Sequence, residues 1–294
     1  MSQGNAELHA FFHEPSSTVS YMVIDLKTKA TAVIDPAADF NISTGGLDFK
    51  FSQNIEEFIR ARQLRLQWIL ETHVHADHVT AAQYLKSHLG GSVAIGNRIT
   101  EVQKIFSSIY NDASSLNCDG SEFDRLLLPN EVFELGTLKV KAIPTPGHTP
   151  ACISYLIGDM LFVGDSIFMP DFGTARCDFP GGSAPDLYKS ARCLLGLPDE
   201  TRVFVGHDYG PGDRPIKWET TVGEQKRLNI HVKDGIEMKE FVDMREARDS
   251  KLSLPSMIIP SIQINMRAGN LPEVDSNGIS YIKTPINEFP GTRS

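Results

Sequence analysis

Cysteine is scarce in this sequence, which has four in 294 residues: Cys118, Cys152, Cys177 and Cys193. No two of them have the CxxC spacing, and four are too few for a disulfide framework. We therefore expect a reducing, cytoplasmic environment. Cys177 follows Arg176. Because a nearby cation lowers the pKa of a thiol, a reactive thiol and a partly buried, inert thiol both stay open at this position.

Long apolar runs and an excess of positive charge are also missing. No stretch approaches the roughly 20 apolar residues of a membrane-spanning helix, and the polar start, residues 1–7, lacks the basic segment of a secretory signal. The formal net charge is −9, whereas a protein that binds phosphate backbones needs a basic surface. We therefore expect a globular protein that has neither nucleic acid nor a membrane as a partner.

Short strands and helices alternate along the chain. Segments rich in β-branched residues predict strands, and apolar residues with helical spacing predict helices. The predicted strands are 21–26, 31–35, 66–70, 93–95, 131–135, 138–143, 152–157 and 160–163, and the predicted helices are 54–64, 80–89 and 99–110. Residues 39–52 and 111–124 read as loops, and Asn54 is the expected N-cap of the first helix. This order predicts an α+β protein with two sheets packed face to face and helices on the outer faces. We expect one domain over residues 1–294, with a C-terminal extension from about residue 221.

A histidine cluster follows the predicted strand 66–70. His73, His75, Asp77 and His78 form the pattern HxHxDH. Side chains alternate along an extended chain, so His73 and His75 face the same side and can reach one ion. Asp77 and His78 start the turn into the next helix, where a second cation is within reach. The cluster predicts a metal site.

One loop cannot complete a metal coordination shell, so further ligands are expected at other strand ends. His148, Asp165 and His207 each follow an apolar strand and a glycine, which lets the chain turn sharply into a shared pocket. The other histidines, such as His9, His13, His88 and His231, lack this setting. They are expected to be ordinary surface or core residues.

The order HxHxDH, GHTP, GD and a late GH resembles the signature of the metallo-β-lactamase superfamily, which implies an αββα sandwich. Within that superfamily the chain is similar to the persulfide dioxygenases, over about residues 12–269. The segments that match this family are 72–80, 146–150, 164–165, 176–179, 207–209 and 265–269.

The resemblance implies one Fe(II) per chain, held by His73, His148 and Asp165. Two imidazoles and one carboxylate leave open positions, as in non-haem Fe(II) oxygenases. The implied partners are glutathione persulfide and O₂, which with water give glutathione and sulfite. His75, Asp77, His78 and His207 then become polar neighbours of the iron or an unused second metal site.

The substrate contacts are also expectations. Arg176 is the candidate for gripping the glutathione carboxylates, with an equal alternative that it pairs with Asp178 or Asp171 and orders its loop. Tyr209 offers a phenolic hydrogen bond to substrate or to water on the metal, and is a candidate catalytic residue. Arg214 and Lys217 lie in the loop after His207 and are expected to cover the entrance.

The main alternative is a dinuclear zinc hydrolase of the glyoxalase II kind, which cleaves thioesters. All seven ligands of such a site are present: His73, His75, Asp77, His78, His148, Asp165 and His207. Residues 79–82 replace the Gly-Gly that follows the cluster in those thioesterases, and this difference favours the dioxygenase. A non-enzymatic carrier with a structural metal is disfavoured, because closed structural sites are typically rich in cysteine. A homodimer stays open.

Overall fold

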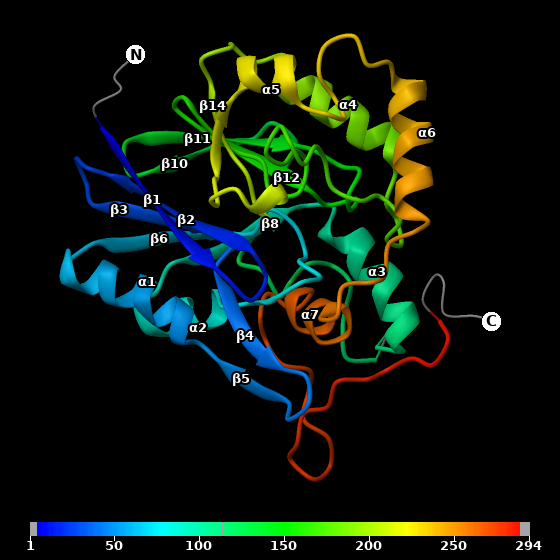
Figure 1. Cartoon of the computed structure of the whole chain (residues 1–294). Coiled ribbons are helices and arrows are strands. Elements are labelled where there is room, and N and C mark those ends of the chain that lie inside the picture. The colour runs from blue at the N-terminus through cyan, green and yellow to red at the C-terminus, as the bar shows by residue number, and fades with distance from the viewer. Residues whose placement is uncertain (1–4, 113, 289–294) are drawn as a thin grey trace.

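In the computed structural model, which describes residues 5–112 and 114–288, two six-stranded sheets pack face to face with helices on both outer sides (Figure 1). The first sheet has the strand order β1-β2-β3-β6-β8-β9 and the second the order β10-β11-β12-β13-β14-β15. A three-stranded sheet, β5-β4-β7, lies beside them.

The strands of the first sheet are β1 (Ala6–His13), β2 (Thr18–Asp25), β3 (Ala30–Ile34), β6 (Arg65–Leu70), β8 (Ser92–Gly96) and β9 (Arg125–Leu127). Those of the second are β10 (Val132–Leu135), β11 (Leu138–Pro144), β12 (Ile153–Ile157), β13 (Met160–Phe162), β14 (Arg202–Phe204) and β15 (Glu219–Thr221). The small sheet contains β4 (Ala37–Asn41), β5 (Gly46–Asp48) and β7 (Val79–Thr80). The α-helices are α1 (Lys50–Ala61), α2 (Ala82–Leu89), α3 (Ile99–Tyr110), α4 (Ala184–Leu195), α5 (Val222–Leu228), α6 (Met238–Asp249) and α7 (Ile258–Asn265), and a short 3₁₀ helix, η1, covers Pro211–Asp213.

The alternation of side chains along each strand produces the layers of the fold. In β2, Met22 and Ile24 pack in the cluster shared with α1, α2, α3 and α7, whereas Tyr21 and Val23 face the space between the sheets. Alternate residues of a strand point to opposite faces, so one strand serves two hydrophobic clusters. A third cluster joins the outer face of the second sheet to α4, α5 and α6, for example through Leu187. The four layers are therefore helix, sheet, sheet and helix, and the predicted αββα sandwich is confirmed.

Several predicted elements need correction. The first helix begins at Lys50 and not after Asn54, and Phe49 at its N-cap makes no side-chain cap hydrogen bond. The segment 39–52, predicted as a loop, contains β5, most of β4 and the start of α1. Strand β4 pairs with β5 and with the distant β7, so its strand state comes from tertiary pairing and not from its polar sequence. Strands β1 and β9 were not predicted.

Other predictions are confirmed. Helix α3 has the predicted bounds, and β12 and β13 form the predicted antiparallel hairpin around Gly158. Helix α2 ends at Gly90, which has a positive φ. It starts at Ala82 and not at Thr80, because Val79 and Thr80 belong to β7. The residues after β15 include α5, α6 and α7, which lie on both sides of the sandwich (Figure 1).

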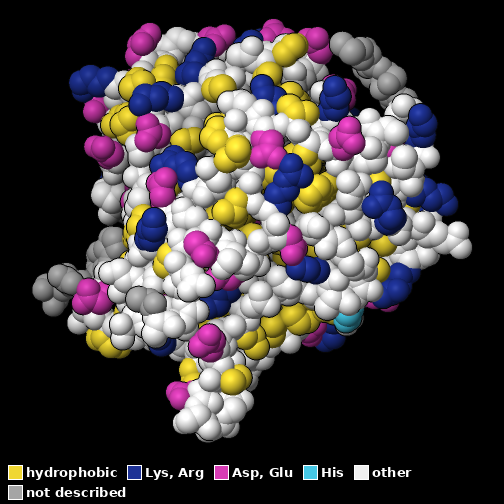
Figure 2. Space-filling model, turned by 180° about the vertical axis from the view of Figure 1, so that it is seen from behind, with side chains coloured by type: hydrophobic (Ala, Val, Ile, Leu, Met, Phe, Trp, Pro, Cys, Tyr) yellow, Lys and Arg dark blue, Asp and Glu magenta, His cyan; other side chains and the backbone are white. Residues whose placement is uncertain are grey.

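The surface is mixed in charge. Figure 2 shows lysine and arginine side chains interspersed with aspartate and glutamate over the face opposite to the one in Figure 1. Within the described residues, no helix combines the length and the apolar character that crossing a bilayer requires.

Candidate metal centre

The loops that follow four strands meet at one end of the sandwich. The loop after β6 carries the histidine cluster, and the loops after β11, β13 and β14 carry His148, Asp165 and His207. The candidate ligand atoms of His73, His148 and Asp165 lie within 4.8 Å of one another. Asp165 Oδ2 is 3.9 Å from His73 Nε2 and 3.8 Å from His148 Nε2. The structure therefore brings together the three residues that the family resemblance implied as ligands of one ion.

A second group of ligands adjoins the first. His75, Asp77 and His78 also have candidate ligand atoms within 4.8 Å of one another. His207 connects the two groups, because its Nε2 lies 3.3 Å from Asp165 Oδ1 and 3.7 Å from Asp77 Oδ2. The seven predicted residues thus form one continuous cluster.

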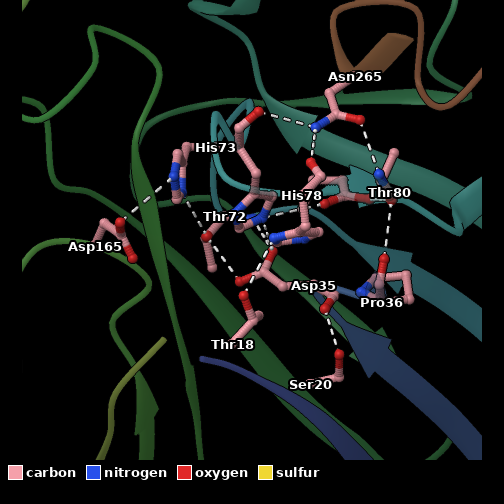
Figure 3. Close-up of polar contacts among 12 residues, drawn as sticks. Thr18, Ser20, Asp35, Pro36, Thr72, His73, His78, Thr80, Asp165 and Asn265 are labelled. Carbon is pink, nitrogen blue, oxygen red and sulfur yellow. Dashed lines mark hydrogen bonds and ion pairs between the residues drawn. The ribbon is translucent and has the colours of Figure 1, made fainter. Parts of the chain in front are cut away.

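Asp35 and Thr72 orient His73 (Figure 3). Asp35 accepts hydrogen bonds from the Thr72 backbone N–H at 2.7 Å and from the Thr72 hydroxyl at 2.8 Å. The Thr72 hydroxyl has one proton, which it gives to Asp35, so it accepts from His73 Nδ1 at 3.0 Å. The proton of His73 therefore sits on Nδ1, and Nε2 is left with its lone pair for a metal.

His148 is oriented in the same way by a backbone carbonyl. Its Nδ1 donates to the carbonyl oxygen of Arg176 at 2.8 Å, which leaves Nε2 as the acceptor that faces Asp165. In the second group, His78 Nδ1 lies 2.9 Å from Asp77 Oδ2. Each of these contacts fixes which nitrogen of the ring is free to bind a cation.

The residues fit a bound metal. Several buried polar atoms at the cluster have no hydrogen-bond partner, among them His73 Nε2, His75 Nδ1, His78 Nε2 and Asp165 Oδ1. A buried polar atom that lacks a partner costs about 1–3 kcal/mol, and a divalent cation removes that cost by accepting the lone pairs. Burial, with the neighbouring imidazoles of His75 and His148, holds the pKa of His73 well below its usual value. His73 is therefore neutral near pH 7, as a ligand must be.

Asn265 of α7 holds the backbone of the histidine loop (Figure 3). Its amide nitrogen donates to the carbonyls of His75 at 2.9 Å and His78 at 2.8 Å, and its oxygen accepts from the N–H of Thr80 at 2.8 Å. This residue belongs to the segment 265–269 that matched the family pattern. Its position explains why that segment, far away in sequence, accompanies the metal-site motifs.

Sequence reasoning missed several residues that contact the cluster. The Thr18 hydroxyl lies 3.1 Å from Asp77 Oδ2, 3.2 Å from His78 Nδ1 and 3.4 Å from His207 Nδ1. Glu71 Oε2 lies 3.5 Å from His75 Nε2. Asp35 follows the apolar strand β3 directly, and this strand-end position was a usable signal. Thr18 begins a strand and offers no comparable signal.

A cavity of about 400 Å³ opens onto the cluster. Asp77, His148, Asp165 and His207 are among the residues that line it. Its walls include the aromatic and aliphatic side chains of Phe168, Phe172, Phe179, Tyr209 and Leu252. The Tyr209 and His207 rings lie parallel within 9°, with centroids 5.8 Å apart. Tyr209 therefore lies where the sequence expected it, beside the metal ligands and facing the space for a substrate.

The predicted basic residues are placed differently. Arg176 lines the cavity, but its guanidinium forms a two-pronged ion pair with Asp178 at 2.6 and 2.7 Å. Arg214 is held by Asp171 and Asp208, and neither Arg214 nor Lys217 is among the residues that line the cavity. Of the alternatives for Arg176, the structure has the pair with Asp178. The entrance cover expected from Arg214 and Lys217 is not present in this arrangement.

Cys177 is a buried thiol. It is 8% exposed, and burial raises its pKa far above the usual value. Its backbone N–H donates to Asp249, so the residue serves to attach its loop to α6. Of the two interpretations left open for Cys177, the structure favours the inert thiol.

A four-layer sandwich with a histidine- and aspartate-rich cluster at one end of its strands defines a class of metal-binding proteins. The chain belongs to the metallo-β-lactamase superfamily, whose family model matches residues 14–207.

Two relatives match this chain over nearly their whole length. The chain is 43% identical to a probable metallo-hydrolase of Burkholderia pseudomallei, over 95% of this chain and 99% of the relative. It is 46% identical to glyoxylase B2 of Dictyostelium discoideum, over 96% and 97% of the two chains.

Persulfide dioxygenases are more distant relatives. Human persulfide dioxygenase ETHE1 is 26% identical, over 89% of this chain and 88% of the human protein. The crystal structure of ETHE1 from Myxococcus xanthus has a TM-score of 0.72 and 29% identity, covering 90% of this chain and all of that one. These similarities support the superfamily and its metal-binding fold, while the more similar full-length relatives favour the hydrolase alternative over the dioxygenase.

Proposed function

We propose that this chain is a metal-dependent hydrolase that cleaves a small thioester at two neighbouring divalent cations. The observation that carries the proposal is the pair of adjoining ligand groups. Each group contains a buried ring nitrogen that has no hydrogen-bond partner, His73 Nε2 in the first and His78 Nε2 in the second. A site for one ion at the first group would leave His78 Nε2 unsatisfied.

His73, His148 and Asp165 would hold the first cation, and Asp77, His78 and His207 the second. Asp165 faces both positions, because Oδ2 points to His73 and His148 whereas Oδ1 points to His207. Imidazole and carboxylate ligands without thiolate suit Zn²⁺ in catalytic sites. A pair of such cations makes water nucleophilic near neutral pH and polarises the carbonyl to be cleaved.

The chain itself supplies orientation and a dry pocket. Thr72 and the carbonyl of Arg176 keep the ligand nitrogens of His73 and His148 free of protons. The Tyr209 hydroxyl offers a donor to the substrate at the cavity wall, and Phe168 and Phe172 exclude water from the reacting group. The hydrolase names of the Burkholderia and Dictyostelium relatives agree with this assignment.

A second candidate is a persulfide dioxygenase that oxidises glutathione persulfide with O₂ at one Fe(II). The observation that favours it is the first group alone, because two histidines and one carboxylate form the ligand set of non-haem Fe(II) oxygenases. The similarity to ETHE1 from Myxococcus xanthus supports the same candidate. In that case His75, Asp77, His78 and His207 would be polar neighbours of the iron.

Metal analysis together with two assays separates the candidates. For a hydrolase we expect two zinc ions per chain and cleavage of S-lactoylglutathione. His78→Ala should lower the metal content to one ion and the turnover by about 10²-fold or more, because it removes a ligand of the second group. His88→Ala, an exposed histidine on α2, is the matched control and should change neither value. One iron per chain, with persulfide-dependent O₂ uptake retained in His78→Ala, would replace the hydrolase with the dioxygenase.

A further inference from the structure

Three arginines line the cavity, and two of them are already paired. Arg176 is held by Asp178, and its remaining donor, Nη1, binds the carbonyl of Ser253 at 2.7 Å. Arg245 is 1% exposed and forms an ion pair with Asp249 at 2.7 Å. The charges of both guanidinium groups are therefore neutralised by carboxylates of the protein. Neither arginine can bind an anion without losing an existing partner.

Arg248 is different. It is exposed on the last turn of α6, and its guanidinium carbon lies 5.8 Å from the centre of the Phe172 ring. Within residues 5–112 and 114–288, no carboxylate forms an ion pair with it. Among the described residues, Arg248 is therefore the arginine on the cavity wall whose guanidinium remains available to bind an anion.

The residues that line the cavity differ in how exposed they are. Its inner part contains the nearly buried ligands His148 and Asp165, which are 4% and 9% exposed, whereas Arg248 is exposed at the rim. The wall also includes the apolar side chains of Phe168, Phe172 and Leu252. A ligand that fits has its reacting group near the metal ligands, an apolar part against these side chains, and an anionic group at the exposed end.

We infer that Arg248 is the residue that binds the free carboxylate of the proposed thiol-conjugate substrate at the rim of the cavity. A guanidinium binds a carboxylate through two parallel hydrogen bonds, and Phe172 holds the guanidinium in place beneath. Arg248 takes the role that was one of the two alternatives for Arg176, whose guanidinium is occupied by Asp178. This inference rests on the proposed function for the thiol conjugate.

Binding measured without turnover tests the inference. Isothermal titration calorimetry on the metal-loaded protein would compare glutathione with its diethyl ester, which keeps the thiol and lacks both carboxylates. We expect the parent protein to bind glutathione about tenfold more tightly than the ester, as one charge-assisted contact predicts. In Arg248→Ala the two should bind with equal affinity, and Arg248→Lys should recover part of the difference.

Lys251→Ala is the matched control. Lys251 is an exposed cation three residues further along the chain that does not line the cavity, so its removal should leave the preference for glutathione unchanged. The inference is overturned if Arg248→Ala keeps the preference, if the parent protein has none, or if the parent binds neither ligand at millimolar concentration. Because no turnover is measured, failure of the hydrolase assignment would be recognised separately, by the metal content and the thioester assay.

Discussion

At the scale of single residues, His231 illustrates how a hydrogen bond fixes a protonation state. The backbone N–H of Thr174 donates to His231 Nδ1 at 3.0 Å, so this nitrogen must be unprotonated. Burial, together with the charges of Arg245 and Arg248, lowers the pKa of His231 to about 4. The residue lies outside the metal cluster, as the sequence suggested, and its role is to hold the loop around Thr174.

The lowered pKa of His231 predicts a pH-dependent stability. Between pH 6.5 and about 4 the unfolded chain binds a proton at this imidazole and the folded protein does not, so stability is lost as the pH falls. His231→Asn keeps an acceptor for Thr174 but cannot titrate. We expect the parent to lose about 2 kcal/mol more free energy of unfolding than this variant between pH 7 and pH 5, at roughly 1.4 kcal/mol per pKa unit.

Urea denaturation of both proteins at the two pH values, with zinc present in excess, measures the difference. Effects of pH on metal affinity are common to both proteins and cancel in the comparison. His88→Asn serves as a control, because His88 is exposed. Identical pH profiles for the parent and His231→Asn would contradict the assigned protonation state.

At the scale of elements, the turn after β13 connects the second sheet to the metal centre. Gly164 has φ +48, and a Cβ there would lie 2.5 Å from Thr72 Oγ1, the hydroxyl that orients His73. We expect Gly164→Ala to displace Thr72 and lower metal affinity by about 10- to 100-fold, as loss of a contact behind a ligand does. Dialysis against metal buffers followed by metal analysis measures the change.

Gly158→Ala is the matched control for that prediction. Gly158 also has a positive φ, +64, but no atom lies within 4 Å of a Cβ built there. Both variants carry the cost of a left-handed backbone, about 1–2 kcal/mol. If Gly158→Ala loses as much metal as Gly164→Ala, the effect comes from general destabilisation and not from the contact with Thr72.

Local signals account for the elements that the sequence predicted. Helical spacing located α3, and a turn between two β-branched runs located the hairpin of β12 and β13. Strand-end positions located the candidate ligands, which are the histidine cluster with His148, Asp165 and His207, and the family resemblance implied the set His73, His148 and Asp165. Strand β4 and the contacts of Thr18 could not be predicted, because they depend on pairing with segments that lie dozens of residues away.

The same limit applies to the substrate contacts. Arg176 pairs with Asp178, and Arg245 pairs with Asp249. Within the part of the chain that the structure describes, these two pairings leave the guanidinium of Arg248 without a carboxylate partner. Those pairings depend on how α6 packs beside the cavity. A single sequence shows the arginines, but it does not show which of them is left without a partner.

At the scale of the whole molecule, a bound metal ties together loops from both sheets. The first sheet supplies the histidine cluster, and the second supplies His148, Asp165 and His207. Removal of the metal with a chelator should therefore lower the free energy of unfolding, by about 3–4 kcal/mol relative to protein with free cation at 100 to 1,000 times its Kd. Thermal unfolding with and without chelator measures the loss.

Added zinc should restore the melting temperature of the chelated protein. Asp165→Asn keeps the size of the side chain but removes the carboxylate that faces both ligand groups, so its melting temperature should respond little to chelator or zinc. A parent protein whose melting temperature ignores both reagents would show that the cluster is satisfied without a metal.

The hydrogen bonds from Asn265 to the histidine loop also determine when, during synthesis of the chain, the loop can reach its final geometry. Asn265 is made 190 residues after His75, and it supplies the donors for the carbonyls of His75 and His78. At a synthesis rate of about 5–20 residues per second, this interval is roughly 10–40 s. During that interval the imidazoles of the histidine loop are present in the growing polypeptide, but the hydrogen bonds from Asn265 to the loop backbone are not yet formed. The mature geometry is completed late, when translation has passed α7.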